Sequence, residues 1–455
     1  MCIRDRNWAK ENQIDATIDE VGNIIMRKPA TPGMENRKGI ILQGHLDMVP
    51  QKNEDKVHDF TKDPIDAYVD GEWVRAKGTT LGADNGMGVS AGMAVLTATD
   101  IPHGPIEVLI TATEETGMDG ANGLKPGVLK GDILLNLDSE TEGELYVGCA
   151  GGLDSTIEFD YKEAAVPADS KAFKLSLKGL KGGHSGMDIN LGRGNSNKLL
   201  FRFLKANAKA LDLRMAAVNG GSLRNAIPRE SFALVTVPSE NAGQLQAKVA
   251  EASAIYKAEL IEKDPDVKLL VEEAELPARV MDADLQERLI DAIMGCPNGT
   301  VRMIDSMPGT VETSNNLAIV KTTEDKIVIN TLMRSSVETA KDYLADSLQA
   351  VFELAKADRI IFDGAYPGWK PNPHSAILKL MQEIYQKMYH KAPEIMAVHA
   401  GLECGILGAK YPNWDMISFG PTICHPHSPD EKVNIASVGK FWDYLKEVLK
   451  EVPVK

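Results

Sequence analysis

Cysteine, positive charge and long apolar runs are all scarce in this chain. Its five cysteines among 455 residues are scattered, odd in number and without Cys-x-x-Cys spacing, which favours reduced thiols. No apolar run approaches the roughly 18 residues that a membrane-spanning helix needs. No positively charged start is followed by an apolar stretch of the signal-peptide kind. We therefore expect a cytoplasmic protein.

The excess of acidic over basic side chains gives a formal net charge of −15. Phosphate backbones and anionic membrane surfaces repel such a protein, so we expect neither a nucleic-acid nor a membrane partner. Hydrophobic residues make up 43% and charged residues 25% of the chain, as in ordinary globular proteins. Because 455 residues are too many for one ordinary core, the length predicts two domains.

Four short apolar runs are each followed by side chains that can bind a metal. Residues 39–43, 106–111, 133–137 and 416–420 have the continuous apolar character of buried parallel strands. The side chains that follow them are, in order, His45 and Asp47, Glu114 and Glu115, Asp138, and finally His425 and His427. Ligands of open α/β sheets gather outside the carboxyl ends of the strands, so the pattern predicts one shared site.

Asp84 lies just before a stretch of small residues, 87–97, that favours a helix packed closely on the sheet. An aspartate in this position is usually an N-cap. The other motifs favour a different role, because a carboxylate that bridges two metals is what a site with two histidines and two further acids lacks. We therefore expect Asp84 to bridge.

The charges of this ligand set suit two divalent ions. Asp84, Glu115 and Asp138, together with a bound hydroxide, would balance them. Imidazole and carboxylate ligands suit zinc, although manganese or cobalt would accept the same set. Two ions about 3.5–4 Å apart can polarise a carbonyl group and lower the pKa of a shared water, which is the chemistry of amide hydrolysis.

Two acids remain once these ligands are assigned. Glu114 is expected to act as general base towards the metal-bound water and then as proton donor to the leaving amine. Asp47 lies on the same side of an extended segment as His45. We expect it to hydrogen-bond the outer nitrogen of His45 and so fix the tautomer of that ring.

These motifs together resemble the co-catalytic zinc peptidases related to carboxypeptidase G2 and aminoacylase. The similar segments are His45-Leu46-Asp47, residues 82–86, the Glu114-Glu115 pair, Asp138 and His427-Ser428-Pro429-Asp430-Glu431. Residues 44–52, 148–152 and 399–405 narrow the resemblance to the bacterial aminoacyl-histidine (Xaa-His) dipeptidases, and it spans nearly the whole chain.

The resemblance implies a definite division of the ligands. His45 and Asp138 would hold one metal, Glu115 and His427 the other, with Asp84 bridging, Asp47 supporting and Glu114 as base. It also favours His427 over His425. The family has a strand and a helix before the segment that begins near Trp8, whereas residues 1–6 show no such pattern, so a shortened N-terminus is expected.

The metal-type motifs stop after Gly152 and resume near His399, which indicates an inserted domain. We expect an α/β catalytic domain over 1–152 and 357–455, with a mixed, mostly parallel sheet flanked by helices. The α/β insert over 153–356 is predicted to have strands at 173–178, 232–237, 316–320 and 326–333, and helices at 197–210, 242–263, 285–294 and 337–355. In the family the insert is a lid and often the dimer surface, so a homodimer is implied.

Five further residues have two interpretations each. His184, in a glycine-rich turn, is an exposed loop residue or a donor to the substrate carbonyl or oxyanion. Arg224 and Asn225 are a turn with its capping cation, or substrate contacts. Arg334 clamps the substrate carboxylate, for which its fork geometry is suited, or forms a surface ion pair. Glu403 contacts the substrate amino group, or has a supporting or helix-start role.

The sequence therefore predicts a metallo-exopeptidase that hydrolyses dipeptides, with a lid that closes over a short substrate. A preference for Xaa-His dipeptides (carnosine-like, with wider tolerance) rests on the resemblance alone. The alternatives with the same site are a deacylase of N-acyl amino acids and a tripeptidase. An alternative of another class is a catalytically inactive, metal-stabilised binding protein.

Overall fold

The computed structural model describes residues 2–455, and their side chains from Arg6 onward. Contacts within the chain divide it into two units. The first unit contains the residues up to Cys149, together with Trp369–Ala397 and Leu402–Lys455, and the second contains Ala150–Gly368 and Val398–Gly401. The assignment of these parts as catalytic domain and lid stays a prediction.

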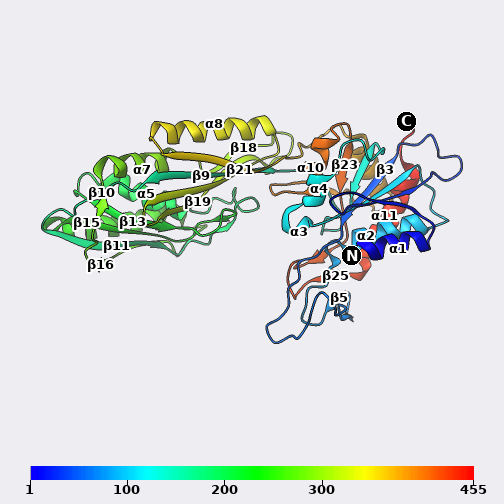
Figure 1. The fold of residues 1–455 in the computed structure, drawn as a ribbon, viewed down its shortest axis with the longest axis horizontal. Coiled ribbons are helices and arrows are strands. Elements are labelled where there is room, and N and C mark those ends of the chain that lie inside the picture. The colour runs from blue at the N-terminus through cyan, green and yellow to red at the C-terminus, as the bar shows by residue number, and fades with distance from the viewer. Residues whose placement is uncertain (1) are drawn as a thin grey trace. The chain divides into compact units, whose positions relative to one another are not determined.

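The first unit is built around a mixed sheet with the strand order β1-β2-β6-β3-β7-β23-β8-β22; Figure 1 labels β3 and β23 of this sheet. Its strands are β1 Asp15–Ile18, β2 Ile24–Lys28, β3 Ile40–His45, β6 Ile106–Thr111, β7 Ile133–Asn136, β8 Glu144–Cys149, β22 Glu394–Val398 and β23 Asp415–Ser418. The four central strands, β6, β3, β7 and β23, are parallel. These are the four predicted apolar runs, and they are buried because both faces of the sheet are covered.

Helices flank this sheet, as predicted. They are α1 Cys2–Glu11, α2 Ala83–Thr97, α3 Glu114–Gly117, α4 Asp119–Gly123, α9 Ala376–Tyr389, α10 Glu403–Lys410 and α11 Ile435–Glu451. Small residues let α2 lie close to the sheet, since a Cβ added at Gly92 would lie 3.0 Å from a methyl group of Val108 on β6. The expectation of no regular element over residues 1–6 is wrong for Cys2 to Arg6, which are part of α1.

A small antiparallel sheet with the order β24-β25-β5-β4 completes the first unit. Its strands are β4 Ala67–Asp70, β5 Trp73–Ala76, β24 Ile423–Cys424 and β25 Lys432–Asn434. It joins the segment before α2 to the segment around His427, because β25 pairs with both β24 and β5.

The second unit is an antiparallel sheet with helices packed against it. The strand order is β16-β11-β15-β13-β19-β20-β9-β21, and β18 also pairs with β19. The strands are β9 Gly151–Asp160, β11 Ser170–Lys178, β13 Arg214–Gly220, β15 Ser231–Pro238, β16 Lys268–Ala274, β18 Gly299–Met303, β19 Val311–Thr322, β20 Lys326–Ser335 and β21 Arg359–Tyr366. The four strands predicted within this part are confirmed as β11, β15, β19 and β20.

Its helices are α5 Ser196–Asn207, α6 Ala242–Leu260, α7 Ala283–Gly295 and α8 Glu338–Leu354, which confirms the four predicted helices. Neighbouring helices pack in the order α6, α5, α7, α8, and Figure 1 shows α8 running along the sheet. An extensive core of buried aliphatic and aromatic side chains fills the space between helices and sheet, including Phe159, Phe173, Phe201 and Phe352. The second unit also contains two short antiparallel strand pairs. They are β10 Glu163–Ala164 with β17 Val280–Met281, and β12 Gly183–His184 with β14 Ala226–Ile227.

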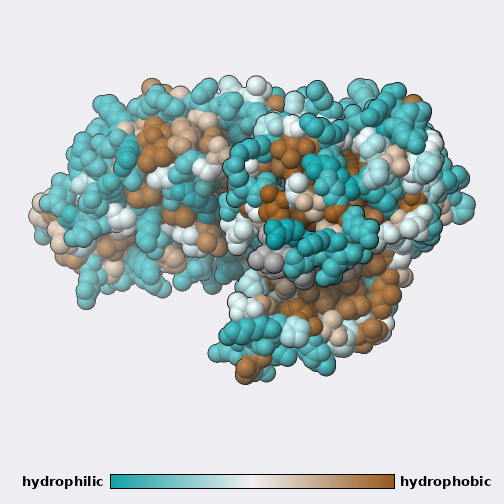
Figure 2. Space-filling view, turned by 45° about the vertical axis from the view of Figure 1, so that its right-hand side comes forward, coloured by the Kyte–Doolittle hydropathy of each residue, from teal (hydrophilic) through white to brown (hydrophobic). Residues whose placement is uncertain are grey.

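The visible surface is mainly polar. Figure 2 shows mostly hydrophilic side chains on the visible face, with hydrophobic ones in separate groups. Among residues 2–455, none of the helices combines the length and the apolar character that crossing a membrane would require.

Candidate metal centre

The first unit brings the five predicted ligands together at the carboxyl edge of its central strands. His45 is the last residue of β3, and the β6, β7 and β23 strands lead into the segments that carry the other side chains. Those side chains are Glu115 in α3, Asp138 two residues after β7, His427 after β24, and Asp84 at the start of α2. The convergence follows from parallel pairing, which places the strand ends side by side.

Asp84 lies between the two histidines. Its Oδ1 is 3.0 Å from Nε2 of His45, and its Oδ2 is 3.1 Å from Nε2 of His427. Each carboxylate oxygen therefore faces a different imidazole. The alternative that Asp84 is an N-cap is wrong, because the N-cap of α2 is Gly82 and no side chain caps this helix.

The other two acids each approach one histidine. Asp138 Oδ1 lies 3.2 Å from His45 Nε2, and Glu115 Oε2 lies 3.1 Å from His427 Nε2. The donor atoms form three groups within which all lie within 4.8 Å of one another: His45 with Asp84 and Asp138, Asp84 with Glu115 and His427, and His45 with Glu114 and Glu115. The first two are the groups that the resemblance implied, with Asp84 in both. Their role as metal ligands stays a prediction.

The chemistry of these groups fits divalent cations. Glu115 Oε1 is buried and takes part in no hydrogen bond, whereas the buried Asp138 Oδ1 faces His45 Nε2 at 3.2 Å. A buried acceptor without a partner costs about 1–3 kcal/mol. Cations bound between the imidazole nitrogens and carboxylate oxygens would supply the missing partners, and mixed nitrogen and oxygen ligands suit zinc.

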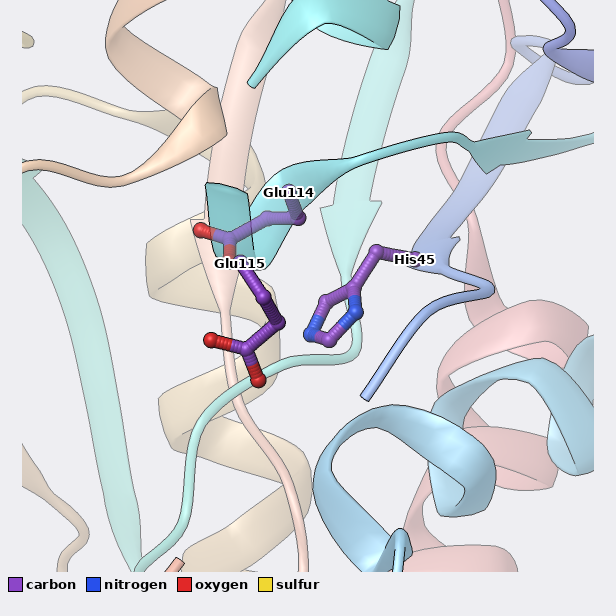
Figure 3. A group of neighbouring side chains, drawn as sticks. All are labelled: His45, Glu114 and Glu115. Atoms are coloured by element: carbon purple, nitrogen blue, oxygen red, sulfur yellow. The ribbon is translucent and has the colours of Figure 1, made fainter. Parts of the chain in front are cut away.

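Glu114 is absent from the two groups that contain Asp84 and belongs to the third, with His45 and Glu115. Figure 3 shows its carboxylate near that of Glu115, with both glutamates close to the His45 ring. Burial, and next the charge of Asp138, raise the pKa of Glu114 to about 8 in the metal-free protein. Bound cations would oppose this shift. A carboxyl group with a raised pKa beside a metal centre is suited to exchanging protons.

Asp47 supports the site differently from the prediction. The group 2.9 Å from His45 Nδ1 is the main-chain oxygen of Asp47, whereas its carboxylate is 3.7 Å away. The carboxylate instead accepts hydrogen bonds from the backbone N–H groups of Glu114 and Glu115, each at 3.0 Å. The expectation that the Asp47 carboxylate hydrogen-bonds His45 is therefore wrong, because the main-chain oxygen of Asp47 makes this contact. One residue still orients both the imidazole and the Glu114-Glu115 pair.

Without metal, both histidines are held in the charged form. Burial opposes the charge of His45, but the carboxylates of Asp138, Asp47 and Asp84 outweigh it and raise the pKa of His45 well above its ordinary value. Hydrogen bonds to Asp84 and then Glu115 raise the pKa of His427 to about 10. The metal-free centre at neutral pH therefore contains two imidazolium groups.

Metal binding should release protons, because an imidazole must be neutral to act as a ligand. We expect about two protons to leave each chain when the centre fills at pH 7, and metal affinity to rise with pH towards the pKa of His427. Calorimetric titration of the metal-free protein in buffers of different ionisation enthalpy measures this release. An affinity that does not change between pH 6 and pH 9 would contradict the assignment of His45 and His427.

The geometry agrees with the prediction of His427, rather than His425, as the proposed ligand. Both residues have left-handed backbone conformations, with φ of 56° and 59°. Such values are uncommon for residues other than glycine. His427 belongs to a group with Asp84 and Glu115, whereas His425 belongs to none of the groups, although both histidines are exposed.

His184 lies in the second unit and is half-buried in the β12 strand. Its Nδ1 accepts hydrogen bonds from the backbone N–H groups of Gly186 and Met187, both at 3.1 Å. Burial and the nearby charge of Arg334 lower the pKa of His184. The interpretation as a freely exposed loop residue is therefore wrong. With Nδ1 accepting, the proton of the neutral ring is on Nε2.

Arg224 and Asn225 differ in their surroundings. The guanidinium of Arg224 donates to the Ser155 main-chain oxygen at 2.8 Å and to Thr156 Oγ1 at 2.7 Å, both on β9. This agrees with the interpretation of a cation that holds a turn. Asn225 has an exposed side chain, and its main-chain oxygen accepts from the N–H of Ser185 at 2.8 Å. A substrate contact by either residue stays a prediction.

Arg334 is buried, with only 5% of its surface exposed, so the interpretation as a surface ion pair is wrong. Its Nε donates to Ser185 Oγ at 3.3 Å, and one terminal nitrogen donates to the Tyr366 hydroxyl at 3.0 Å. Over residues 6–455, whose side chains are described, no carboxylate forms an ion pair with Arg334. A buried cation without a counter-ion is costly unless a ligand supplies the charge.

Glu403 is 1% exposed in the first turn of α10. Its Oε2 accepts hydrogen bonds of 2.6 Å from both Gln43 Nε2 and Thr111 Oγ1, on β3 and β6. Its Oε1 is buried without a partner. Burial raises the pKa of Glu403 to about 7. Glu403 thus lies directly behind the strand ends, where it can support the centre or present one free oxygen to a ligand.

Two acids near the centre were missed by the sequence analysis. Glu140 follows Asp138 by two residues, and burial, followed by the charge of Asp84, raises its pKa to about 7. Glu431 is buried and bonds to the backbone of the Asp84 loop. Glu431 belongs to the His427 motif, so the available signal was its fixed spacing from a predicted ligand.

The fold and the cluster of imidazoles and carboxylates define a metal-dependent hydrolase. The sequence matches the profile described as Peptidase family M20/M25/M40 over residues 41–451, and the chain belongs to this family. Its peptidases are metal-dependent, and the cluster described above is the part of this chain that can hold the metal.

Three proteins with which this chain was compared match nearly its whole length. The chain is 51% identical to the cytosol non-specific dipeptidase of Escherichia coli (strain K12), over 98% of this chain and 92% of the relative. The crystal structure of aminoacylhistidine dipeptidase from Vibrio alginolyticus matches with a TM-score of 0.96 and 52% identity, covering 100% of this chain and 92% of that chain. An aminopeptidase PepT from Bacillus cereus shares the fold, with a TM-score of 0.56 and 15% identity over 99% of this chain and 92% of that chain.

Proposed function

We propose that this protein is a di-zinc dipeptidase that hydrolyses Xaa-His dipeptides and tolerates other dipeptides. The observation that carries the proposal is the position of Asp84 between His45 and His427, with Glu114 beside them. The names of the two full-length relatives support the substrate class, since one is a non-specific dipeptidase and the other an aminoacylhistidine dipeptidase. The name of the first also supports a cytoplasmic location.

In this proposal His45 and Asp138 hold one ion, Glu115 and His427 hold the other, and Asp84 is shared. Two bound divalent ions would polarise the scissile carbonyl and lower the pKa of a water molecule. Zinc is favoured by the ligand set, and manganese or cobalt would fit it. Asp84 belongs both to the group of His45 and Asp138 and to the group of Glu115 and His427, which supports a pair of ions that share it.

Glu114 moves the proton. Its carboxylate takes a proton from the attacking water and delivers it to the amine nitrogen as the C–N bond breaks, so that the products are two amino acids. Asp47 contributes by fixing the main chain of Glu114, which limits the directions in which the carboxylate can point. Glu114 needs this restraint because α3 is only one turn long.

His184 is proposed as a donor to the carbonyl oxygen of the substrate. The ring is neutral and its Nδ1 accepts two backbone hydrogen bonds, so its Nε2–H is the donor that remains. A preorganised donor aimed at developing negative charge is typically worth about 2.7–4 kcal/mol in acyl transfer.

Arg334 and Glu403 are proposed to recognise the two charged ends of a free dipeptide. The guanidinium of Arg334 is buried without a carboxylate partner, and the C-terminal carboxylate of a dipeptide would supply one. Oε1 of Glu403 is buried without a donor, and the free amino group of the substrate would supply one. Recognition of both ends selects short unblocked peptides over N-acyl amino acids.

Replacing Arg334 with lysine is expected to raise KM for a free dipeptide about 10- to 100-fold, because the fork of hydrogen bonds to a carboxylate is lost. Metal content should not change. The matched control is the same dipeptide as its C-terminal amide, which lacks the carboxylate and should be cleaved equally by both proteins. Steady-state kinetics measure both values, and an unchanged KM for the free dipeptide would refute this role.

The second unit is proposed to provide a homodimer surface. Its edge strand β16 has one unpaired side, and apolar side chains nearby are exposed, namely Ile255 and Ile261 on or just after α6, and Leu270 and Leu276 on or after β16. Unpaired strand edges bordered by apolar side chains favour pairing with another chain.

A substrate series tests the proposed function. Purified zinc-loaded protein is incubated with an Xaa-His dipeptide, the same dipeptide N-acetylated, and a tripeptide that contains it. The proposal predicts rapid cleavage of the free dipeptide only. Preference for the acetylated compound would indicate a deacylase, and preference for the tripeptide a tripeptidase. Metal binding without turnover of any of them would indicate the binding protein.

A further inference from the structure

Glu431 makes four hydrogen bonds to a single loop. One carboxylate oxygen accepts from the backbone N–H groups of Leu81 and Gly82 at 2.7 and 2.9 Å, and the other accepts from those of Ala83 and Asp84 at 2.8 and 3.2 Å. Glu431 is 1% exposed. The whole segment that leads into Asp84 is therefore held by one buried side chain.

A tight turn connects Glu431 to His427. The N–H of Glu431 donates to the main-chain oxygen of Ser428 at 3.0 Å, and the N–H of Asp430 donates to Ser428 Oγ at 3.1 Å. Pro429 occupies the second position of this turn, where its fixed φ is favourable. The imidazole of His427 and the carboxylate of Glu431 are thus presented from the two ends of one rigid turn.

The contacts link Glu431, Asp84 and His427 to one another. Glu431 holds the backbone of Asp84, and the carboxylate of Asp84 in turn faces His427, which directly precedes the Ser428–Glu431 turn. We propose that Glu431 is a positioning residue that fixes Asp84 and His427 relative to each other and thereby sets the metal affinity of the centre. This inference rests on the proposed metal site.

A carboxylate is suited to this role for two reasons. Hydrogen bonds to an ionised acceptor are roughly twice as strong as neutral ones, and both oxygens of a carboxylate can accept. A glutamine would keep one acceptor and place an NH₂ group against two of the N–H donors. The surroundings are also apolar, since Ala83, Ile423 and Val433 form a buried cluster with Leu81 beside the bonded loop. Removal from water strengthens such bonds.

The test compares two glutamates that hold backbone N–H groups in the same unit. Glu107, 7% exposed, accepts from the N–H groups of Lys130 and Gly131 at 2.6 and 2.8 Å, near the opposite end of β6. E431Q and E107Q therefore each weaken backbone hydrogen bonds to a buried carboxylate. Glu431 lies beside the proposed metal ligands, whereas Glu107 lies at the far end of a central strand. Both proteins are stripped of metal, and their zinc affinity is measured by competition with a chelator of known affinity.

We expect E431Q to bind zinc about 10- to 100-fold more weakly than the unmodified protein, the range typical of residues that orient ligands. E107Q should keep the original affinity. Thermal unfolding of the metal-free proteins, measured in parallel, separates a general loss of stability from this effect. An E431Q protein with unchanged zinc affinity would overturn the inference, as would an equal loss of affinity in E107Q.

Two additions keep the outcome interpretable. E431D keeps the charge but shortens its reach by one methylene, so it should lie between E431Q and the original protein, and it serves as the test variant if E431Q does not fold. Original affinity in E431D under that condition would overturn the proposal. If the unmodified chain itself binds no zinc, the proposed function fails instead, and the two failures are therefore distinguishable.

Discussion

Replacing Glu114 with glutamine is expected to lower kcat by about 10²- to 10⁴-fold, the contribution typical of a positioned general base. Glutamine has almost the same shape and keeps the backbone N–H that Asp47 binds, but it cannot take a proton from water. Zinc content, measured by elemental analysis, should stay normal because Glu114 lies outside the two groups that share Asp84, which are the proposed ligand sets.

The neighbouring glutamate provides the matched control. E115Q changes the same functional group one residue away, but Glu115 belongs to the group of Asp84 and His427, so this variant should lose activity together with metal. Steady-state rates at saturating zinc separate the two cases. Normal turnover by E114Q, or loss of zinc from it, would show that Glu114 is not the base.

Replacing Asp84 with alanine should have the largest effect on metal binding. Asp84 is the member common to both ligand groups, so its loss removes a ligand from each ion at once. We expect the affinity for both ions to fall by more than ~100-fold, beyond the usual cost of losing a merely orienting residue. Activity at physiological zinc concentrations should disappear.

A control for D84A is D132N. The Asp132 carboxylate accepts from the N–H of Gly39 at 2.9 Å, at the opposite end of the central strands from the ligands. D132N should retain both ions even if its thermal stability falls. Chelator competition with elemental analysis gives the stoichiometry. A D84A protein that still binds two ions with normal affinity would contradict a bridging role.

The central strands and the proposed ligand residues could be predicted from the sequence because buried parallel strands require continuous apolar runs. Continuous apolar runs such as 106–111 identify strands buried on both faces, and the residues after them must meet at one edge. Asp84 was identified by chemistry rather than by local pattern, since its position before a helix alone favours an N-cap.

Directions of side chains could not be predicted in the same way. Spacing placed Asp47 on the side of His45, but the atom that reaches the imidazole is the main-chain oxygen, because the carboxylate turns to the backbone of Glu114. The left-handed backbone of His427 has no sequence signature, since such conformations are uncommon for residues other than glycine. Such details depend on tertiary contacts.

The exposed edges of the fold were also missed. The four residues of β4 are all exposed, and β16 has a single buried residue, Leu269, so neither has the apolar pattern that marks a buried strand. Arg224 shows the same limit at a single residue, because its bonds to β9 join positions about seventy residues apart.

The most direct measurement of the central claim is the metal content of the purified chain by elemental analysis, together with its hydrolysis of an Xaa-His dipeptide before and after chelation. We predict about two zinc ions per chain, as expected of a co-catalytic site, with cleavage that chelation abolishes and added zinc restores. A folded chain that contains no metal, or that cleaves the dipeptide equally well after complete chelation, would contradict it.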